Sequence, residues 1–229
     1  MAIKSLLLSP SFTVEAAKLI TQTLNTYNCI HVKDWPEDSP AEAVIVRSKD
    51  PVNHDFIKRF PNLKIVVTAT SGFDHIDLSL AKKTDIKFCY SPNANVSSAS
   101  ELTLWHILNL LKKGSGLSGK WDWRSPSVLG RELQSLQVCL IGLGRIGKAV
   151  AKKLQAFECK VSAHDPYLSQ KVFTEVGVER LSLEDSLKKA DVLSLHCPLT
   201  AKTRNLINQE ALNVMKKNAV LINLSLIHI

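Results

Sequence analysis

The sequence lacks several features that mark particular classes of protein. Among its 229 residues no apolar run approaches the roughly 20 residues needed to cross a bilayer. The three leucines at residues 6–8 are too few for the core of a signal peptide. The five cysteines are odd in number and scattered, without a Cys-x-x-Cys pair. We therefore predict a cytoplasmic protein without a membrane segment or a metal site, whose cysteines are small buried hydrophobes.

The positive charge of the chain is not concentrated in one segment. The formal net charge is +8, yet no basic run exceeds two or three residues and no basic stripe alternates with aromatic residues. Lysines occur instead as pairs that mostly fall late in predicted helices, where cations suit the helix dipole: Lys82-Lys83, Lys112-Lys113, Lys152-Lys153, Lys188-Lys189 and Lys216-Lys217. This pattern favours a solvated surface, and we predict no nucleic-acid partner.

What the chain does have is a regular alternation of short apolar runs and helical stretches. Most of the runs are continuously apolar, which is typical of parallel strands covered on both faces. The predicted strands span residues 5–8, 43–46, 64–68, 86–89, 137–141, 160–164, 191–195 and 219–223. With helices between them, they indicate an α/β fold of right-handed βαβ units.

One long helix is predicted from about Ser98 to Lys113. Ser98 and Glu101 form a capping-box pattern at its start, and its apolar residues continue nearly all round, so we expect it to be buried. The glycine-rich residues 114–119 follow as a linker. We place a domain boundary near residue 98, with one domain at 1–98 and a second at 99–229.

A glycine motif follows the strand at 137–141. Gly142, Gly144 and Gly147 have the spacing G-x-G-x-x-G, and helical periodicity begins directly after them. In such a motif the first glycine permits a tight turn, the second lets a pyrophosphate approach the backbone, and the third lets the helix pack close to the strand. The phosphates then lie at the helix N-terminus. The alternative is a glycine-rich turn in another α/β fold.

An acidic residue ends the next strand. Asp165 comes eighteen residues after Gly147 and is followed by Pro166. A carboxylate there accepts both ribose hydroxyls of an adenosine and repels a 2′-phosphate, and no Arg or Lys adjoins it. The cofactor predicted from these residues is therefore NAD rather than NADP.

The third strand of this part ends at His196-Cys197-Pro198. Pro198 stops the strand at its carboxyl end, where ligands bind in such sheets. His196 has two interpretations: an acid–base group, or a passive histidine beside the cofactor or a neighbouring helix. We favour the second.

Several segments in order resemble the D-isomer-specific 2-hydroxyacid dehydrogenases, including the phosphoglycerate-dehydrogenase-like members. They are VIVRS (44–48), SGFDHID (71–77), GKWDW (119–123), IGLGRIG (141–147), HDPY (164–167), HCPLTAKT (196–203), LIN (206–208) and KNAVLIN (217–223). The resemblance covers nearly the whole chain up to Asn223. It implies two doubly wound parallel-sheet domains: a flavodoxin-like substrate domain and a Rossmann NAD-binding domain that is incomplete at its C-terminus.

The resemblance also implies roles for individual residues. The loop at Ser71 and Gly72 would offer backbone N–H groups to the carboxylate of a small 2-hydroxy or 2-keto acid, and Arg47 would approach the same substrate. Further cofactor contacts would come from Ser71, Thr103, Arg145, Ile146, Cys197, Pro198 and Thr203, beside the glycines, Asp165 and Pro166. Arg47 has a second interpretation as a surface ion-pair residue, and Thr103 as a helix-packing residue. Full-length members of the family would be homodimers.

The resemblance stops before the catalytic set of the family. In the family an arginine, a glutamate and a histidine perform hydride-transfer chemistry, and Leu226 stands at the arginine position here. His228 matches no family motif, so we assign no catalytic residue. We expect a catalytically incomplete fragment of an NAD-dependent dehydrogenase. The alternative is an NAD(H)-sensing binding module, because Phe73-Asp74, residues 106–110 and residues 165–169 also resemble the C-terminal-binding-protein corepressors.

Overall fold

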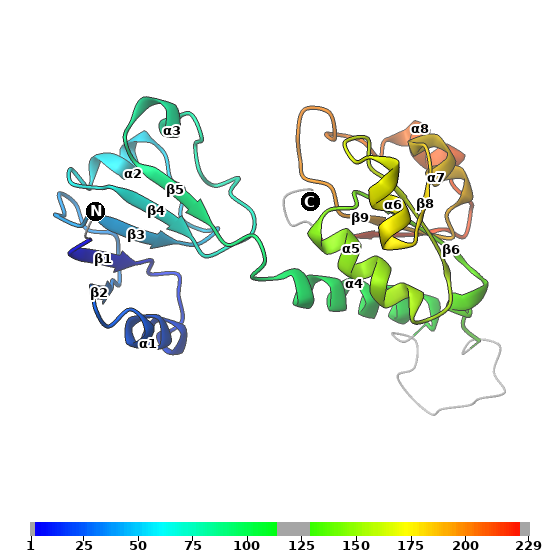
Figure 1. Cartoon of the computed structure of the whole chain (residues 1–229), viewed down its shortest axis with the longest axis horizontal. Coiled ribbons are helices and arrows are strands. Elements are labelled where there is room, and N and C mark those ends of the chain that lie inside the picture. Colours follow the sequence, from blue (N-terminus) through cyan, green and yellow to red (C-terminus); the bar gives the residue numbers. More distant parts are fainter. Residues whose placement is uncertain (1–2, 114–128, 225–229) are drawn as a thin grey trace. The chain divides into compact units, whose positions relative to one another are not determined.

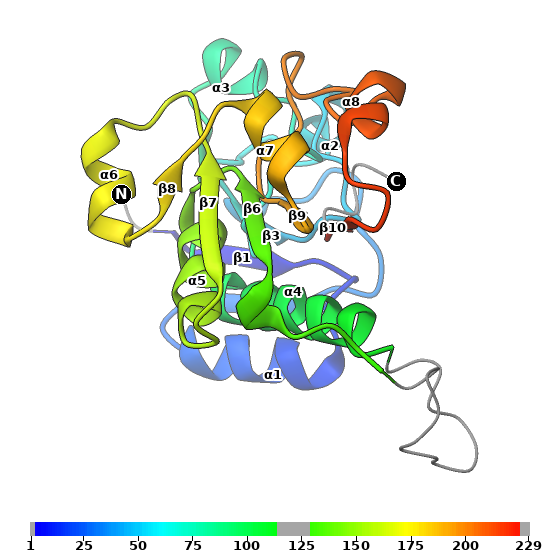
Figure 2. The same cartoon turned by 90° about the vertical axis from the view of Figure 1, so that its right-hand side faces the viewer.

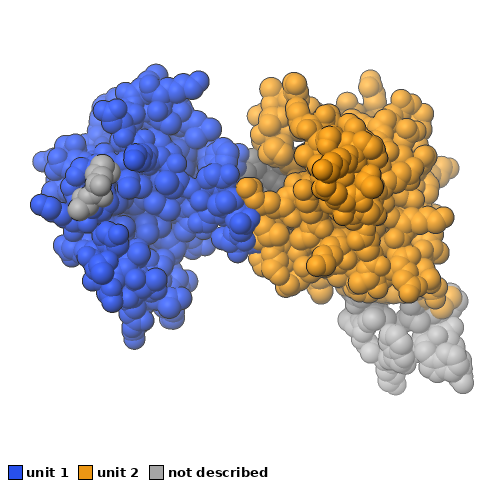
Figure 3. Space-filling model, viewed as in Figure 1, with its two compact units in different colours: residues 1–95 blue, residues 96–229 orange. Residues whose placement is uncertain are grey.

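The computed structural model describes residues 3–113 and 129–224. The chain divides into two compact units, Met1–Asn95 and Val96–Ile229, which Figure 3 draws in two colours. Each unit has its own five-stranded sheet in which every pairing is parallel. The predicted α/β class with two doubly wound parallel sheets is confirmed.

The first unit has the strand order β2-β1-β3-β4-β5 (Figure 1), which is the flavodoxin-like order. Its elements are β1 (Ser5–Leu8), α1 (Val14–Thr23), β2 (Asn28–His31), β3 (Ala43–Val46), α2 (His54–Lys58), β4 (Ile65–Thr68), α3 (Leu80–Lys83) and β5 (Lys87–Tyr90). Helix α1 covers one face of the sheet through Ala17, and α2 covers the other through Phe56. The strand order changes direction between β1 and β3, so the carboxyl ends of these two strands form the switch point where ligands bind in open α/β sheets.

The second unit has the order β10-β9-β6-β7-β8, which is the Rossmann order for five strands. Its elements are α4 (Val96–Leu111), the short 3₁₀ helix η3 (Leu133–Ser135), β6 (Gln137–Ile141), α5 (Arg145–Gln155), β7 (Lys160–His164), α6 (Gln170–Val176), β8 (Glu179–Arg180), α7 (Leu183–Lys189), β9 (Val192–Leu195), α8 (Gln209–Val214) and β10 (Val220–Asn223). The switch point of this sheet lies between β6 and β9.

Strand β6 shows why both faces of the second sheet are covered. Val138 and Leu140 pack on one face with side chains of α4, α5 and α6, whereas Cys139 and Ile141 pack on the other with α7 and α8. All four side chains are almost fully buried. Figure 2 shows β6 and β7 side by side in this sheet. The continuous apolar run at residues 137–141 therefore reflects burial on two faces.

Helix α4 differs from its prediction in two ways. It begins at Val96, so Ser98 lies inside the first turn and is not the N-cap. Ile107 and Leu111 are buried, but Trp105 is 57% exposed and Leu102 is 47% exposed. The prediction that the helix is buried all round is therefore wrong, because one face packs within its own unit and the opposite face does not.

The cysteines also depart in part from expectation. Cys139 and Cys159 are buried, and Cys29 and Cys197 are half-buried, but Cys89 on the edge strand β5 is exposed. Within residues 3–113 and 129–224, no helix is long and apolar enough to cross a membrane. The segments GKWDW and 114–119, and the residues Leu226 and His228, lie outside the described residues.

Candidate functional site

The turn between β6 and α5 has a backbone conformation that glycine adopts far more readily than other residues. Gly142 has φ +97°, and its N–H donates to the His164 carbonyl at 2.8 Å. A Cβ on Gly142 would lie 2.8 Å from both Cys197 N and the His196 carbonyl carbon. The turn therefore packs directly onto the segment after β9, at the switch point of the second sheet.

The other two glycines differ in what surrounds them. A Cβ on Gly147 would lie 2.3 Å from the Gly142 carbonyl oxygen, so α5 approaches the turn too closely for a side chain at this position. A Cβ on Gly144 would meet nothing within 4 Å. Because Gly144 has φ −73°, which other residues adopt freely, open space rather than backbone strain distinguishes this position.

The open space adjoins the N-terminus of α5. The helix begins at Arg145, its N-cap Gly144 supplies no side-chain hydrogen bond, and its first turn contains no acidic residue. The first N–H groups of such a helix have no partner within the helix, and the helix dipole is positive there. This end of α5 therefore fits an anion such as the pyrophosphate of a dinucleotide.

Asp165, directly after β7, is held beside the glycine turn. Its Oδ2 accepts the N–H of Leu143 at 3.0 Å, and its Oδ1 accepts the N–H of Tyr167 at 3.1 Å. A carboxylate has about four acceptor sites, so two backbone bonds leave it able to accept hydroxyl groups. Pro166, next to it, is exposed.

His196, directly after β9, is a neutral histidine. Its backbone N–H donates to the Ile141 carbonyl at 2.7 Å, and its Nε2 lies 2.9 Å from the Ser194 hydroxyl. Burial lowers the pKa of His196 to about 4. The partner of the ring is a serine rather than a carboxylate, and no group in the described part of the chain raises its basicity. This favours the passive interpretation over an acid–base role.

The loop from Cys197 to Thr203 is fixed by its own hydrogen bonds. Thr203 Oγ1 donates to the Pro198 carbonyl at 2.6 Å and accepts the N–H of Thr200 at 2.7 Å. Burial raises the pKa of the Cys197 thiol, so this side chain stays protonated. The backbone of Cys197 meets Gly142, so the loop and the glycine turn belong to one cluster.

Three further residues predicted for the cofactor site lie on helices. Arg145 is exposed and Ile146 is half-buried in the first turn of α5. Thr103 is fully buried on α4, where its hydroxyl donates to the Ala99 carbonyl at 2.9 Å. Hydrogen bonds thus do not join Thr103 to the cluster around Gly142.

In the first unit, Arg47 directly follows β3 at the switch point. Its Nη1 donates to the Ser11 carbonyl at 2.8 Å, and its guanidinium lies 5.5 Å from the centroid of the Phe12 ring. Across residues 3–113 and 129–224, Arg47 forms no ion pair. The described residues therefore give no support to its alternative interpretation as an ion-pair residue.

The Ser71–Gly72 loop offers unused backbone donors. Neither the N–H of Ser71 nor that of Gly72 donates to an acceptor in the described part of the chain, and Gly72 is exposed. Thr70 Oγ1 donates to the Gly72 carbonyl at 2.7 Å and lies 2.6 Å from the Thr68 hydroxyl. The threonines were not predicted from sequence, because no motif separates them from ordinary strand residues.

Four features of the second unit together define a dinucleotide-binding domain of the doubly wound α/β class. They are the order of the strands, the glycine turn, the helix α5 without a side-chain N-cap, and the aspartate after the second strand. A family model described as the NAD binding domain of D-isomer specific 2-hydroxyacid dehydrogenase matches residues 105–226. The chain belongs to the D-isomer specific 2-hydroxyacid dehydrogenase family, and its second unit carries the family's NAD-binding domain.

Relatives of known function are dehydrogenases and reductases. The chain is 36% identical over 190 residues to a D-3-phosphoglycerate dehydrogenase of Mycobacterium bovis, a match that covers 80% of this chain and 35% of that protein. It is 35% identical over 207 residues to a glyoxylate reductase of Thermofilum pendens, covering 83% of this chain and 61% of that protein. The chain thus spans about a third of the length of the phosphoglycerate dehydrogenases that it matches.

A match to a solved structure shows that the similarity to this family includes the first unit. A crystal structure of D-lactate dehydrogenase from Aquifex aeolicus, complexed with NAD and lactic acid, matches with a TM-score of 0.82 and 32% identity. That match covers 96% of this chain and 68% of the other. The predicted family resemblance is confirmed.

Proposed function

We propose that this chain comprises the NAD-binding and carboxylate-binding parts of a D-2-hydroxyacid dehydrogenase, which interconverts a 2-hydroxy acid and a 2-keto acid by hydride transfer. The observation that carries the proposal is the open space at Gly144, in front of the uncapped N-terminus of α5 and beside Asp165. The relatives described above favour this function over a corepressor-like binding module. The second unit then corresponds to the cofactor domain and the first to the substrate domain, with the boundary near residue 98.

In this proposal most of the groups that hold NAD lie in the second unit, around the glycine turn. The N-terminus of α5, with Arg145 and Ile146, receives the pyrophosphate across Gly144. Asp165 accepts the ribose hydroxyls and, with Pro166, excludes a 2′-phosphate. The remaining contacts come from Ser71 and Thr103 and from the loop with Cys197, Pro198 and Thr203. When bound, the nicotinamide supplies the hydride or accepts it.

The carboxylate of the acid is recognised by the first unit. The N–H groups of Ser71 and Gly72, which donate to no acceptor among the described residues, and the remaining N–H groups of the Arg47 guanidinium are donors suited to a carboxylate. These groups recognise the carboxylate itself and leave the rest of the acid unspecified. The proposed substrate class is therefore small 2-hydroxy and 2-keto acids.

Substitution of two glycines tests the cofactor site. Gly144→Ala should lower the free energy of unfolding by no more than about 1 kcal/mol, because its methyl group enters open space and only the preference for glycine over alanine at the N-cap is lost. It should weaken NAD binding by about tenfold or more, since losing a hydrogen bond to a charged group costs about 1.5–3 kcal/mol. Gly147→Ala should instead destabilise the fold, because its Cβ meets the Gly142 carbonyl at 2.3 Å.

Isothermal titration calorimetry with NAD and NADP, together with urea unfolding, makes these comparisons. The wild-type chain should bind NAD more tightly than NADP. If Gly144→Ala binds NAD as tightly as the wild type, the pyrophosphate does not cross Gly144 and the proposed cofactor site is wrong.

The 229-residue chain should bind without turnover. It has Leu226 at the family's arginine position and no matching glutamate or histidine. Loss of one acid–base group alone lowers rates by on the order of 10²–10⁴. Purified chain should therefore not oxidise NADH with glyoxylate, hydroxypyruvate or pyruvate above a protein-free blank. Measurable turnover would show that other residues of this chain perform the catalysis.

A further inference from the structure

The first unit contains a buried carboxylate that is held by neutral donors. Asp50 is 6% exposed. Its Oδ2 accepts the N–H of Arg47 at 2.7 Å and the hydroxyls of Ser9 at 2.6 Å and Ser11 at 3.2 Å. Its Oδ1 accepts the indole N–H of Trp35 at 3.1 Å. Among residues 3–113 and 129–224, no cation forms an ion pair with Asp50. Burying an unpaired charge is costly, so four converging donors indicate a specific structural task.

The hydrogen bonds that Asp50 accepts from its four donors, here called the Asp50 hub, fix the position of Arg47. The Arg47 N–H donates to the Asp50 carboxylate, and the Asp50 N–H donates to the Arg47 carbonyl at 2.9 Å, so the two residues close a turn at the end of β3. Ser11 binds Asp50 through its hydroxyl and the Arg47 guanidinium through its carbonyl. Asp50 therefore restrains both the backbone and, through Ser11, the side chain of Arg47.

The same hub leaves the charge of Arg47 available. A guanidinium has five N–H donors, and the Ser11 carbonyl receives one of them. Had Asp50 faced the guanidinium instead, a bidentate ion pair would have used two more donors and neutralised the charge. The carboxylate binds only the backbone N–H of Arg47, so the positive charge can still be offered to an anion from solution.

The segment that carries Asp50 also anchors the Ser71–Gly72 loop. Two residues after Asp50, the N–H of Val52 donates to the His75 carbonyl at 2.8 Å, and the N–H of Asp77 donates to the Val52 carbonyl at 2.9 Å. Val52 and Ile76 are both buried beneath this pairing. Residues 50–52 therefore tie the turn that carries Arg47 to the loop that carries Ser71.

We propose that Asp50 is a positioning residue of the carboxylate site. Together with Ser9, Ser11 and Trp35, it fixes Arg47 after β3 in alignment with the Ser71–Gly72 loop and does not neutralise the positive charge of the guanidinium. This inference rests on the proposed function, in which Arg47 and this loop bind the substrate carboxylate. Asp50 touches neither substrate nor cofactor in this scheme, and acts through Arg47.

The test is Asp50→Asn, which keeps the size of the side chain but replaces one acceptor oxygen by an NH₂ group. At least one of the four donors then loses its acceptor. Two quantities are measured at a temperature where circular dichroism shows a folded protein. The first is the Arg47 Nε–Hε resonance in a ¹H–¹⁵N spectrum, assigned with Arg47→Lys. The second is the affinity for oxamate, a 2-keto acid analogue, in the presence of saturating NADH.

We expect Asp50→Asn to shift or broaden the Arg47 resonance and to weaken oxamate binding by at least about tenfold, since small misplacements of a positioned group have large effects. NADH affinity should be unchanged. Asp191→Asn is the matched control, because Asp191 is a half-buried carboxylate of the second unit that also accepts a backbone N–H. This control should leave both the Arg47 resonance and oxamate affinity as in the wild type.

Each outcome separates the two proposals. If the Arg47 resonance is unaltered in Asp50→Asn, the positioning role is wrong, whatever oxamate does. If the resonance changes but the wild-type chain binds no oxamate, Asp50 positions Arg47 and the proposed carboxylate site fails. Should Asp50→Asn not fold, Ser11→Ala takes its place, because it removes one hydroxyl donor to Asp50 and keeps the carbonyl that binds Arg47. Ser11→Ala should then produce smaller changes of the same kind, and an unchanged resonance would again overturn the inference.

Discussion

The two ends of the parallel strands use charge in opposite ways. At the carboxyl ends, Arg47 donates to a carbonyl and Asp165 accepts backbone N–H groups, so neither charge is neutralised by a partner in the described chain. At the amino ends, charges are paired. Asp191, before β9, binds Arg131 at 3.2 Å and Lys216 at 3.0 Å. Under the proposed function, the carboxyl ends keep charge for ligands, whereas the amino ends use it to hold strands together.

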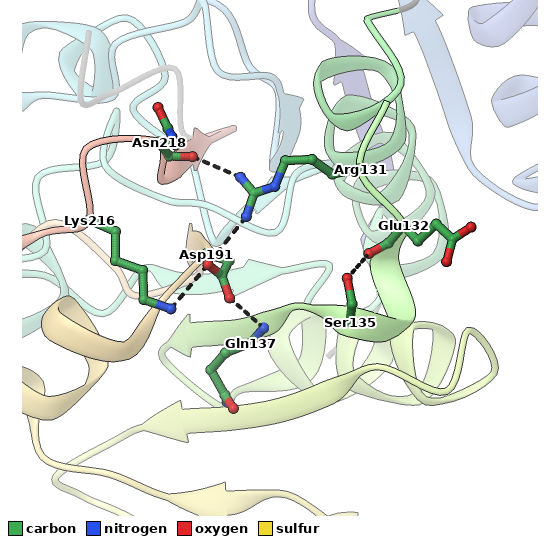
Figure 4. A network of polar contacts seen from close by, with 7 residues as sticks. All are labelled: Arg131, Glu132, Ser135, Gln137, Asp191, Lys216 and Asn218. Carbon is green, nitrogen blue, oxygen red and sulfur yellow. Dashed lines mark hydrogen bonds and ion pairs between the residues drawn. The ribbon is translucent and has the colours of Figure 1, made fainter. Parts of the chain in front are cut away.

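Both sheets follow this rule at their amino ends. In the second sheet, Asp191 also accepts the N–H of Gln137 at 2.9 Å, and Arg131 donates to the Asn218 carbonyl at 2.8 Å (Figure 4). These contacts tie the starts of β6, β9 and β10. In the first sheet, Glu42 before β3 pairs with Lys64 before β4 and accepts the N–H of Lys4 before β1 at 2.6 Å. The hydrogen bond from Lys64 is the main cause that lowers the pKa of Glu42.

The largest effect should come from protonating His196 at the carboxyl end of β9. Burial lowers its pKa to about 4, while an unfolded histidine titrates near 6.5. Between these values the unfolded state binds more protons, so the free energy of unfolding falls as pH drops from about 6.5 towards 4. The loss should reach up to about 3 kcal/mol.

Urea unfolding of the wild type and His196→Gln at pH 7 and pH 4.5 measures this loss. Glutamine retains a partner for Ser194 but does not titrate, so its stability should fall less. Replacing the exposed His54 by glutamine serves as control and should change little. Equal pH dependence in the wild type and His196→Gln would show that this edge tolerates a charged histidine, which would break the comparison between the two ends.

How far the sequence predicts this molecule depends on how local the signal is. The glycine turn and Asp165 were found because their motif lies within 24 residues on a strand, turn and helix. Central strands such as β1, β3 and β6 were predicted to the residue because burial on both faces leaves continuous apolar runs. The edge strands β2 and β8 were missed, since polar side chains are acceptable where one edge meets solvent.

The hydrogen-bond clusters around the carboxylates of Asp50 and Asp191 were not predicted from the sequence, for a different reason. Ser9 is 41 residues from Asp50, and Arg131 is 60 residues from Asp191, so no window of sequence contains both partners. Asp50 gave one local signal, its position three residues after Arg47 at the end of a strand, which fits a side chain that bonds back to the chain. Which hydroxyls complete such a hub follows only from the strand order.

Breaking the amino-end network should have a moderate effect on stability and none on binding. Asp191→Asn leaves the Gln137 N–H and two cations with a weaker acceptor, so we expect a loss of about 2 kcal/mol at pH 7. Burial alone would raise the pKa of Asp191, but the hydrogen bonds from Gln137 and Lys216 and the charges of Lys216 and Arg131 hold it below its ordinary value. Its contribution is therefore present above pH 4 or so and is lost as pH falls through the lowered pKa.

Chemical denaturation of Asp191→Asn, with NAD titration in parallel, checks this expectation. An unchanged NAD affinity alongside lower stability would support the view that the amino ends of the strands stabilise the fold and the carboxyl ends bind ligands. A weaker NAD affinity would show that the network at the amino ends also affects the cofactor site at the carboxyl ends of the strands.

The smallest effect should come from removing one cation of the network. Lys216 has a side chain that is 44% exposed, and in Lys216→Ala the Asp191 carboxylate keeps Arg131 and the Gln137 N–H. We expect a loss below about 1 kcal/mol that shrinks further in 0.5 M salt, because exposed ion pairs are weak and screened. Urea unfolding at low and high salt measures it, with the exposed pair of Lys171 and Glu175 as control through Lys171→Ala. If Lys216→Ala cost as much as Asp191→Asn, the aspartate would be acting mainly through this lysine, and the hydrogen bond to Gln137 would not be what joins the starts of β6 and β9.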